Sequence, residues 1–222
     1  NLKKYLLENI KKPFFSEDDD LEYILDQDII NDYIFMCFLL GNDFLPHLLN
    51  LEISDSHLTK MLDAYYEILV EDKATLINTR DDCINVSFLK RLLEELGREE
   101  DYELETKVSQ FYKKRVFTRG KTEVDKQIEL FDFYPLTIKN KSKDQIRLDK
   151  PGWKNRYYYK NFNIPYGDKA GISNICSAYF TTLNWIYQYY FKTTCPSWDW
   201  SYPFINPPAI TAEGKRSGLK GT

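Results

Sequence analysis

The chain lacks the residue sets on which several common protein classes depend. Its two histidines and four widely spaced cysteines form no zinc-binding pattern and no Cys-x-x-Cys pair. The net charge of −4 argues against a general binder of polyanions, although a local basic groove is compatible with it. No apolar run reaches the roughly 18–20 residues of a membrane span, so we expect no membrane partner. The cysteines favour an intracellular protein with free thiols: Cys37, Cys83, Cys176 and Cys195.

Strand signals and internal repeats are also few, whereas apolar residues at helical spacing are common. The spacing predicts helices at residues 2–10, 21–40, 57–70, 87–96, 99–117 and 175–191. The segment 21–40 is either one helix or two that are broken near residues 26–28. In the fourth helix, Ser87 is the expected N-cap and Gly97 the expected C-cap. Residues 118–150 are predicted to form a long connection, and residues 213–222 a flexible tail. The sequence therefore predicts a mainly α chain.

One run, Leu39-Leu40-Gly41-Asn42-Asp43-Phe44-Leu45-Pro46-His47, ends a segment that is otherwise nearly all apolar. A helix that is apolar on almost every side belongs in a core, so we expect Asp43 at the edge of that core. A buried carboxylate without a partner is costly, and a divalent cation would be a suitable partner. The alternative is structural, with Gly41 ending one helix and the next two residues capping another. His47 has no triad partner, and we expect it to pack or cap.

Aromatic residues are abundant, with 17 tyrosines, 14 phenylalanines and four tryptophans. Such a surplus often serves recognition or stacking as well as packing. Three tryptophans in the last third of the chain are candidates for stacking on single-stranded bases, with core packing as the alternative for each: Trp185, Trp198 and Trp200. Lys154 and Arg156 are candidates for phosphate contacts, with simple exposure to solvent as the alternative.

A family resemblance rests on four segments in a fixed order. Residues 32–47, which end in Leu-Leu-Gly-Asn-Asp-Phe-Leu-Pro-His, resemble with the following Leu51-Glu52-Ile53 the last conserved signature of the Xrn family. That family consists of processive 5′→3′ exoribonucleases. Residues 2–6 (Leu-Lys-Lys-Tyr-Leu), 151–158 (Pro-Gly-Trp-Lys-Asn-Arg-Tyr-Tyr), and 183–190 with 196–203 (Pro-Ser-Trp-Asp-Trp-Ser-Tyr-Pro) are similar to further family segments. The resemblance spans nearly the whole chain and is weak over about residues 55–150.

The resemblance implies a function and a site. It implies part of a divalent-metal-dependent 5′→3′ exoribonuclease that degrades single-stranded RNA bearing a 5′ monophosphate, with two Mg²⁺ or Mn²⁺ ions. In the family, the Asp of the Gly-Asn-Asp motif belongs to an acidic cluster that binds these ions. Asp43 is thus the expected metal ligand, and Asn42 is expected to share or shape its shell as a second catalytic residue. The family also places a stacking aromatic residue in the following region, which the three tryptophans above would supply.

The resemblance implies a domain organisation as well. Residues 1–55 would be the C-terminal part of the nuclease domain, a helical segment that completes a PIN-like α/β catalytic domain mostly absent from this chain. Residues 56–212 would form a helical middle domain. The family's other metal-binding carboxylates and its basic pocket for the 5′ phosphate lie upstream of these motifs. We therefore expect a fragment that is inactive alone, from a protein located in the cytoplasm rather than in the nucleus.

The sequence departs from the family at residues 204–208, and two alternative functions remain open. The family continues Tyr-Pro with Tyr-His-Tyr-Ala-Pro, whereas residues 204–208 are Phe-Ile-Asn-Pro-Pro, so that histidine has no counterpart here. A flap-type structure-specific 5′ nuclease also has Gly-x-Asp after a buried helix, but residues 48–53 lack the glycines of its helix-turn-helix. A catalytically inactive RNA-binding scaffold derived from an Xrn-like enzyme is the other alternative, against which the retained Gly-Asn-Asp speaks.

Overall fold

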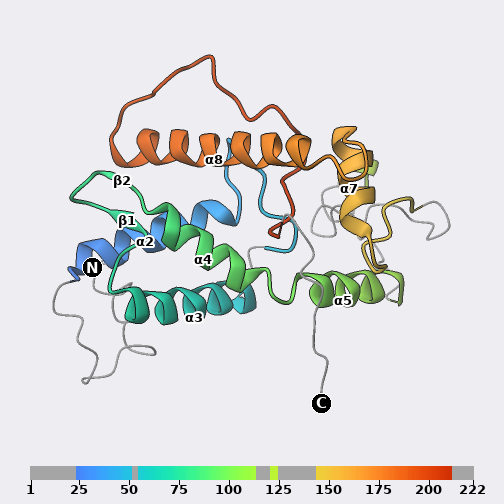
Figure 1. Cartoon of the computed structure of the whole chain (residues 1–222), viewed down its shortest axis with the longest axis horizontal. Helices are drawn as coiled ribbons and strands as arrows, with labels where there is room; N and C mark the ends of the chain where they lie inside the picture. The colour runs from blue at the N-terminus through green and yellow to red at the C-terminus, as the bar shows by residue number, and fades with distance from the viewer. Residues whose placement is uncertain (1–23, 52–54, 114–120, 125–143, 212–222) are drawn as a thin grey trace. The chain divides into compact units, whose positions relative to one another are not determined.

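The computed structural model describes residues 24–51, 55–113, 121–124 and 144–211 (Figure 1). Its elements are α2 (Asp26–Leu39), α3 (Asp55–Asp72), β1 (Ile77–Asn78), β2 (Cys83–Ile84), α4 (Val86–Leu96), α5 (Glu100–Lys113), α7 (Trp153–Phe162) and α8 (Lys169–Phe191). The predicted mainly α class is confirmed. The predicted helix at residues 2–10 and the predicted tail at 213–222 lie outside the described residues. None of the described helices is both long and apolar enough to cross a membrane.

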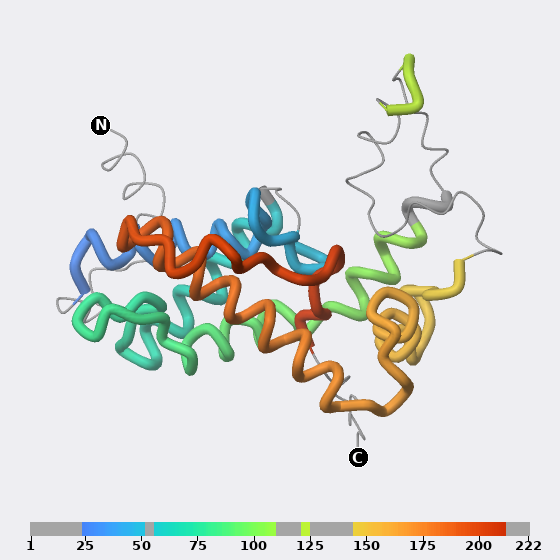
Figure 2. Tube along the Cα trace, turned by 90° about the horizontal axis from the view of Figure 1, so that it is seen from above, coloured from blue at the N-terminus to red at the C-terminus, as the bar shows by residue number. Residues whose placement is uncertain are grey.

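The chain divides into two compact units. The first unit comprises Asn1–Arg98 and Ser177–Ile210, and the second comprises Glu99–Cys176 and Thr211–Thr222. Helix α8 is continuous through the boundary, so its beginning belongs to the second unit and its larger remainder to the first. In the first unit, the segment after α8 turns back and runs along that helix (Figure 2).

The first unit buries one hydrophobic core between α2, α3, α4 and the main part of α8. All four helices contribute side chains that are at most 1% exposed: Phe35, Met36 and Leu39 from α2, Met61 and Leu69 from α3, Phe88 and Leu92 from α4, and Leu183 and Ile186 from α8. In α4 these residues recur at helical spacing, which is why the sequence predicted the helix and its buried face. Burial of this apolar face, more than intrinsic helix propensity, stabilises the helix.

A carboxylate lies inside this core. Asp32, in the middle of α2, is 0% exposed. Its Oδ2 accepts hydrogen bonds from Tyr65 Oη at 2.9 Å and from Leu76 N at 2.8 Å, and its Oδ1 accepts one from Ile77 N at 2.7 Å. One side chain thereby joins α2 to α3 and to the strand β1. The buried carboxylate is satisfied by three donors, which offset the cost of removing it from water.

The strands β1 and β2 form a short antiparallel hairpin, with Ile77 paired to Ile84 and Asn78 to Cys83. Its turn is tied to α8, because Asp82 accepts a hydrogen bond from Tyr187 Oη at 2.9 Å and pairs with Lys192 Nζ at 2.9 Å. The hydrogen bond from Lys192 is the largest cause that lowers the pKa of Asp82. These contacts fix the hairpin against the end of α8.

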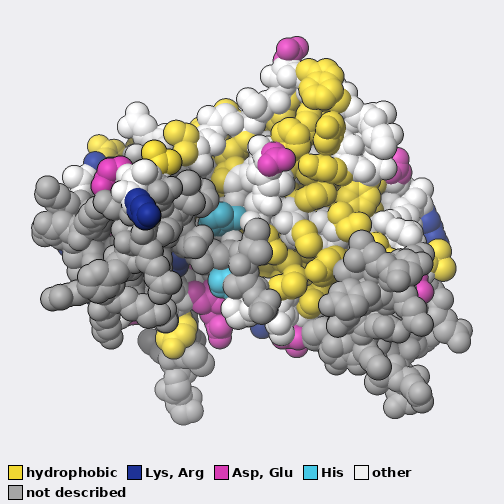
Figure 3. Space-filling model, turned by 180° about the vertical axis from the view of Figure 1, so that it is seen from behind, with side chains coloured by type: hydrophobic (Ala, Val, Ile, Leu, Met, Phe, Trp, Pro, Cys, Tyr) yellow, Lys and Arg dark blue, Asp and Glu magenta, His cyan; other side chains and the backbone are white. Residues whose placement is uncertain are grey.

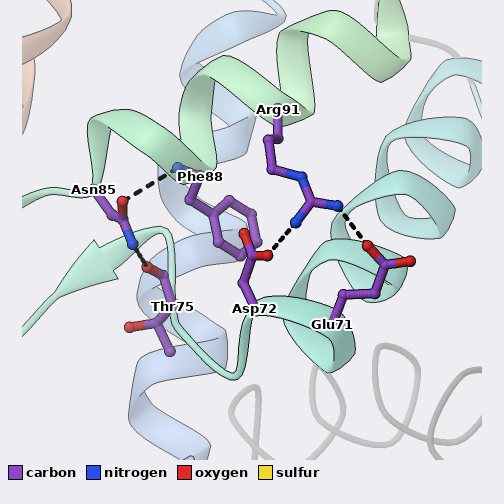
Figure 4. Close-up of polar contacts among 6 residues, drawn as sticks. All are labelled: Glu71, Asp72, Thr75, Asn85, Phe88 and Arg91. Carbon is purple, nitrogen blue, oxygen red and sulfur yellow. Dashed lines mark hydrogen bonds and ion pairs between the residues drawn. The ribbon is translucent and has the colours of Figure 1, made fainter.

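The start of α4 shows a correction to the sequence-based interpretation (Figure 4). The N-cap is Asn85, not Ser87, because Asn85 Oδ1 accepts from Phe88 N at 3.2 Å. The same side chain donates through Nδ2 to Thr75 O at 3.2 Å, so the cap also holds the segment between α3 and the hairpin. Farther along α4, Arg91 pairs with Glu71 and Asp72 at the end of α3. The predicted C-cap Gly97 is confirmed.

The second unit is built from α5, α7 and the first residues of α8. Helix α7 pairs with the start of α5: Trp153 Nε1 donates to Asp101 Oδ1 at 2.8 Å, and Lys154 Nζ lies 2.9 Å from Glu100 Oε2. Glu100 is only 1% exposed, so the carboxylate partner of this ion pair is buried. The sequence did not predict α7, and α8 begins at Lys169 rather than at residue 175.

Asp32 gives the stability of the fold a dependence on pH. Burial is the largest cause that raises the pKa of Asp32 to about 7, against three hydrogen bonds that lower it. A carboxyl whose folded-state pKa lies above its ordinary value stabilises the fold most at low pH, and this contribution is lost as the pH rises through about 7. We therefore expect the free energy of unfolding to fall by up to about 2 kcal/mol between pH 5.5 and pH 8.

Thermal or urea unfolding at several pH values measures this slope. Asp32→Asn is the matched control: it removes the titrating group, and we expect a lower stability with no slope attributable to residue 32. An identical slope in Asp32→Asn would assign the pH dependence to other groups.

Candidate functional site

The turn after α2 places the Gly-Asn-Asp motif at the surface of the first unit. Gly41 has φ +99°, a left-handed conformation that side chains disfavour. A Cβ atom at Gly41 would lie 3.1 Å from both His47 Cβ and His47 N. Leu48 N donates to Leu39 O at 3.3 Å and closes the turn. Glycine is therefore required at this position, and His47 packs against it, as predicted.

Asn42 shapes this turn. Its Oδ1 accepts a hydrogen bond from Phe44 N at 2.9 Å, and its own N donates to Leu45 O at 3.1 Å. The Nδ2 atom is buried and has no hydrogen-bond partner among the described residues. The side-chain oxygen is thus engaged in holding the backbone around Asp43, while one donor remains unused.

Asp43 corrects one expectation from the sequence. The side chain is exposed, so the cost of burial gives no reason for a cation beside it. The carboxylate that is buried is Asp32, and its partners are protein donors. The role of Asp43 as a metal ligand stays a prediction that rests on the family resemblance.

The described residues do not complete a metal site around Asp43. Mg²⁺ and Mn²⁺ prefer several oxygen ligands, and one carboxylate is too few to hold either ion. No group of three or more His, Cys, Asp or Glu in the described part of the chain is arranged to bind a metal. Asp43 can contribute one ligand, and the remaining ligands would have to come from residues outside this part.

Phe44, the residue after Asp43, lies against aromatic side chains of α8. Its ring centroid is 5.0 Å from that of Trp185, 5.5 Å from that of Tyr189 and 6.4 Å from that of Tyr190. Aromatic pairs at 4.5–7 Å contribute about 0.5–1.5 kcal/mol beyond the area that they bury. These contacts anchor the turn that carries the exposed Asp43 to α8. Sequence patterns do not predict these contacts, because Phe44 and Trp185 lie 141 positions apart in the chain.

The three candidate tryptophans have different surroundings. Trp185 is only 7% exposed, stacks on Tyr189 with centroids 5.3 Å apart, and donates through Nε1 to Ser197 O at 2.8 Å. Trp200 is 37% exposed and donates to Thr182 Oγ1 at 3.1 Å. Trp198 is 78% exposed and meets Tyr189 edge to face at 6.3 Å. Trp198 thus presents the most open ring, Trp200 presents part of one, and Trp185 is a core residue.

Trp198 belongs to a surface rich in apolar side chains. Large hydrophobic residues are exposed on α8, on the segment that follows it and on the turn after α2: Phe180 and Tyr190, then Trp198, Trp200 and Ile205, and Phe44. On the face shown in Figure 3, hydrophobic side chains form a continuous band that begins at the segment after α8. Exposed apolar patches of this kind are typical of binding surfaces.

The two basic candidates lie in the second unit, and both make internal contacts. Arg156 donates to four backbone carbonyl oxygens, those of Ile146, Arg147, Lys150 and Pro151, at distances of 2.6–3.0 Å. Lys154 pairs with buried Glu100, donates to Thr211 and lies 5.3 Å from the ring centroid of Trp153. Their contact with phosphate stays a prediction, and it would compete with these internal bonds.

These observations define a helical domain with an exposed carboxylate on a glycine turn and an aromatic surface on the same unit. The model of the Xrn1 helical domain family matches residues 23–133 and 135–211, and the chain belongs to this family. The predicted recognition is confirmed. The predicted domain boundary at residue 55 stays a prediction.

Several 5′-3′ exoribonucleases are similar to the chain. The 5′-3′ exoribonuclease 2 homolog of Drosophila melanogaster is 23% identical over 93% of this chain and 26% of its own length. The 5′-3′ exoribonuclease 2 of Gallus gallus is 24% identical over 81% of this chain and 25% of its own length. That of Saccharomyces cerevisiae is 32% identical over 55% of this chain and 12% of its own length. The chain thus spans about a quarter of the length of the first two relatives.

The surroundings of the tryptophans predict a large loss of stability for one substitution and almost none for another. Trp185→Ala removes a buried ring and its hydrogen bond, so we expect a loss of about 3–5 kcal/mol in the free energy of unfolding. Trp198→Ala removes an exposed ring, and we expect a change within about 0.5 kcal/mol. Urea unfolding of both variants measures the difference. A large loss in Trp198→Ala would show that its ring supports the core.

Proposed function

We propose that the chain is part of a divalent-metal-dependent 5′→3′ exoribonuclease that degrades single-stranded RNA with a 5′ monophosphate. The observation that carries the proposal is that one compact unit presents both the exposed carboxylate of Asp43 and the open ring of Trp198. Membership of the Xrn1 helical domain family and the names of the relatives support it. The activity belongs to the whole protein, of which this chain would be one part.

Asp43 would be one ligand of the metal site. Its exposure leaves the carboxylate accessible to a cation held mainly by carboxylates outside the described residues. Bound Mg²⁺ or Mn²⁺ would activate water and stabilise the leaving oxygen of the phosphodiester. Asn42 would act as a positioning residue, because its Oδ1 holds the amide of Phe44 and so fixes the direction of Asp43.

Trp198 would be the main base-stacking residue, with Trp200 as a second contact. Aromatic faces bind single-stranded bases with little sequence preference, since every base has a π-face. Trp185 would hold the Trp198 segment in place through its hydrogen bond to Ser197 O, without touching RNA. The aromatic surface carries few basic side chains, so contacts to the phosphates would come from the part of the protein outside this chain, with Lys154 and Arg156 as the weaker candidates.

The cellular location is also part of the proposal. We propose an intracellular protein of the cytoplasm rather than of the nucleus. The four cysteines are free in the structure, as thiols are in reducing compartments. Fluorescence microscopy of the tagged complete protein would test the compartment directly.

The metal-ligand role is tested with Asp43→Asn in the complete protein. We expect the degradation rate of 5′-phosphorylated RNA with Mg²⁺ to fall by at least 100-fold, on the order of the effects that removal of a catalytic group produces. Asp63→Asn, which changes another exposed carboxylate on the same unit, is the control and should keep normal activity.

Near-normal activity of Asp43→Asn would refute the assignment. If the unaltered complete protein binds RNA but degrades none, the inactive scaffold replaces the exoribonuclease. A preference for flap DNA over 5′-phosphorylated RNA would instead favour the flap-type nuclease.

The stacking role is tested by RNA binding in the inactive Asp43→Asn background, where the substrate stays intact. Trp198→Ala should lose about 1–3 kcal/mol of binding free energy, which is a 5- to 150-fold weaker Kd. Tyr102→Ala, which removes an aromatic ring that is 71% exposed in the second unit, is the control and should bind normally. Unchanged affinity of Trp198→Ala would remove this residue from the RNA interface.

A further inference from the structure

We propose that Trp185 and Tyr189 are positioning residues that fix the Asp43 turn and the Trp198 segment to each other. Together with Phe44 and Trp198 they form a chain of ring contacts, which we call the aromatic bridge. The inference rests on the proposed function and deepens it, because it says what sets the register between a stacked base and the phosphodiester to be cleaved.

The contacts of the aromatic bridge are continuous. Phe44 meets Trp185 at 5.0 Å between ring centroids, and Trp185 stacks on Tyr189 at 5.3 Å with an interplanar angle of 11°. Tyr189 meets Trp198 at 6.3 Å and an angle of 79°. Trp185 and Tyr189 are four residues apart on α8, so they lie on the same face of the helix. Two segments far apart in the chain are therefore joined through one pair of stacked rings.

Hydrogen bonds fix the far end of the bridge to the same helix. Trp185 Nε1 donates to the carbonyl of Ser197, the residue immediately before Trp198. The amide of Asp199, immediately after it, donates to Ser197 Oγ at 3.2 Å. Trp200 Nε1 also donates to Thr182 Oγ1, so both Thr182 and Trp185 of α8 hold the segment that follows the helix. The backbone around Trp198 is thus constrained on both sides while its ring stays open.

The near end is constrained in the same way. The amide of Phe44 is held by Asn42 Oδ1, and the Phe44 ring also contacts Tyr189 at 5.5 Å. Asp43 lies between these two fixed residues. The outer rings of the bridge are open to solvent, with Phe44 at 37% and Trp198 at 78%, whereas Trp185 is at 7%. Trp185 is therefore placed to act on position and not by contact with RNA, and the partly buried Tyr189 connects it to Trp198.

Rigid placement matters for this chemistry. A displacement of about 1 Å between a catalytic group and its substrate can lower a rate by roughly 100-fold. Stiff aromatic rings packed at helical spacing lose little conformational entropy and hold such a distance well. Loosening the bridge should therefore lower kcat strongly and leave the affinity for RNA nearly unchanged, because the Trp198 ring itself remains.

Tyr189→Leu in the complete protein breaks the bridge at its centre, and Tyr189→Phe keeps the ring. We expect at least a tenfold lower kcat in Tyr189→Leu with KM changed less than threefold, and normal values in Tyr189→Phe. Tyr102→Leu, which replaces a ring that is 71% exposed in the second unit, is the control and should leave both constants unchanged. Equal losses in the Leu and Phe variants would overturn the proposal.

Amide hydrogen exchange of the complete protein, followed by mass spectrometry, separates this inference from the proposed function. Tyr189→Leu should accelerate exchange in residues 42–46 and in residues 197–201, and Tyr189→Phe in neither. If Tyr189→Leu does not fold, Phe44→Leu serves in its place and should accelerate exchange in residues 197–201. Unchanged exchange there would overturn the bridge, whatever activity the protein has. Coupled exchange in a protein without activity would keep the bridge and refute the exoribonuclease.

Discussion

The architecture of the first unit depends on the three hydrogen bonds that Asp32 accepts. A carboxyl group in a hydrophobic core is tolerated only where hydrogen-bonding groups surround it, and here the donors are Tyr65 Oη of α3 and the backbone amides of Leu76 and Ile77. The side chain therefore specifies which helix face and which strand residues meet α2. Hydrogen bonds are directional, so this network favours one arrangement more sharply than apolar packing does. The hairpin, the Asn85 cap and the start of α4 all follow in the chain from the strand that Asp32 holds.

The sequence predicts the elements whose signals are local. Helices α3 and α4 follow from apolar spacing, and the end of α2 follows from Gly41, because these signals lie within one or two turns of the chain. Helix α7 escapes this reasoning, since it is short, its aromatic residues alternate with Lys, Asn and Arg, and its partners lie elsewhere in the chain, among them Glu100 and Asp101. Strands of two residues are too short to show alternation. Asn85 and Ser87 are both good caps, and the structure assigns the N-cap to Asn85, which also donates to Thr75 O.

In the candidate site, too, local motifs are predictable from the sequence, whereas features that depend on distant contacts are not. Asp43, Asn42 and the three tryptophans are all found from motifs, because the family resemblance resides in contiguous residues. Which carboxylate is buried, and which tryptophan is open, depends on partners far away in the chain: Tyr65 for Asp32, Ser197 for Trp185. Residue type alone does not tell whether Asp32 or Asp43 is the buried carboxylate. Their roles separate only when tertiary contacts assign donors to one and solvent to the other.

Helix α8 has a consequence for any attempt to dissect the molecule. The two compact units meet within an uninterrupted helix, between Cys176 and Ser177. Cutting the chain at that boundary would leave two new helix ends, each with up to four unpaired backbone groups, in place of satisfied hydrogen bonds. The units are separable as clusters of contacts but not as pieces of chain. Exchange of one unit between relatives should therefore respect the phase of the helix, since each inserted residue would turn the following residues of the helix by about 100°.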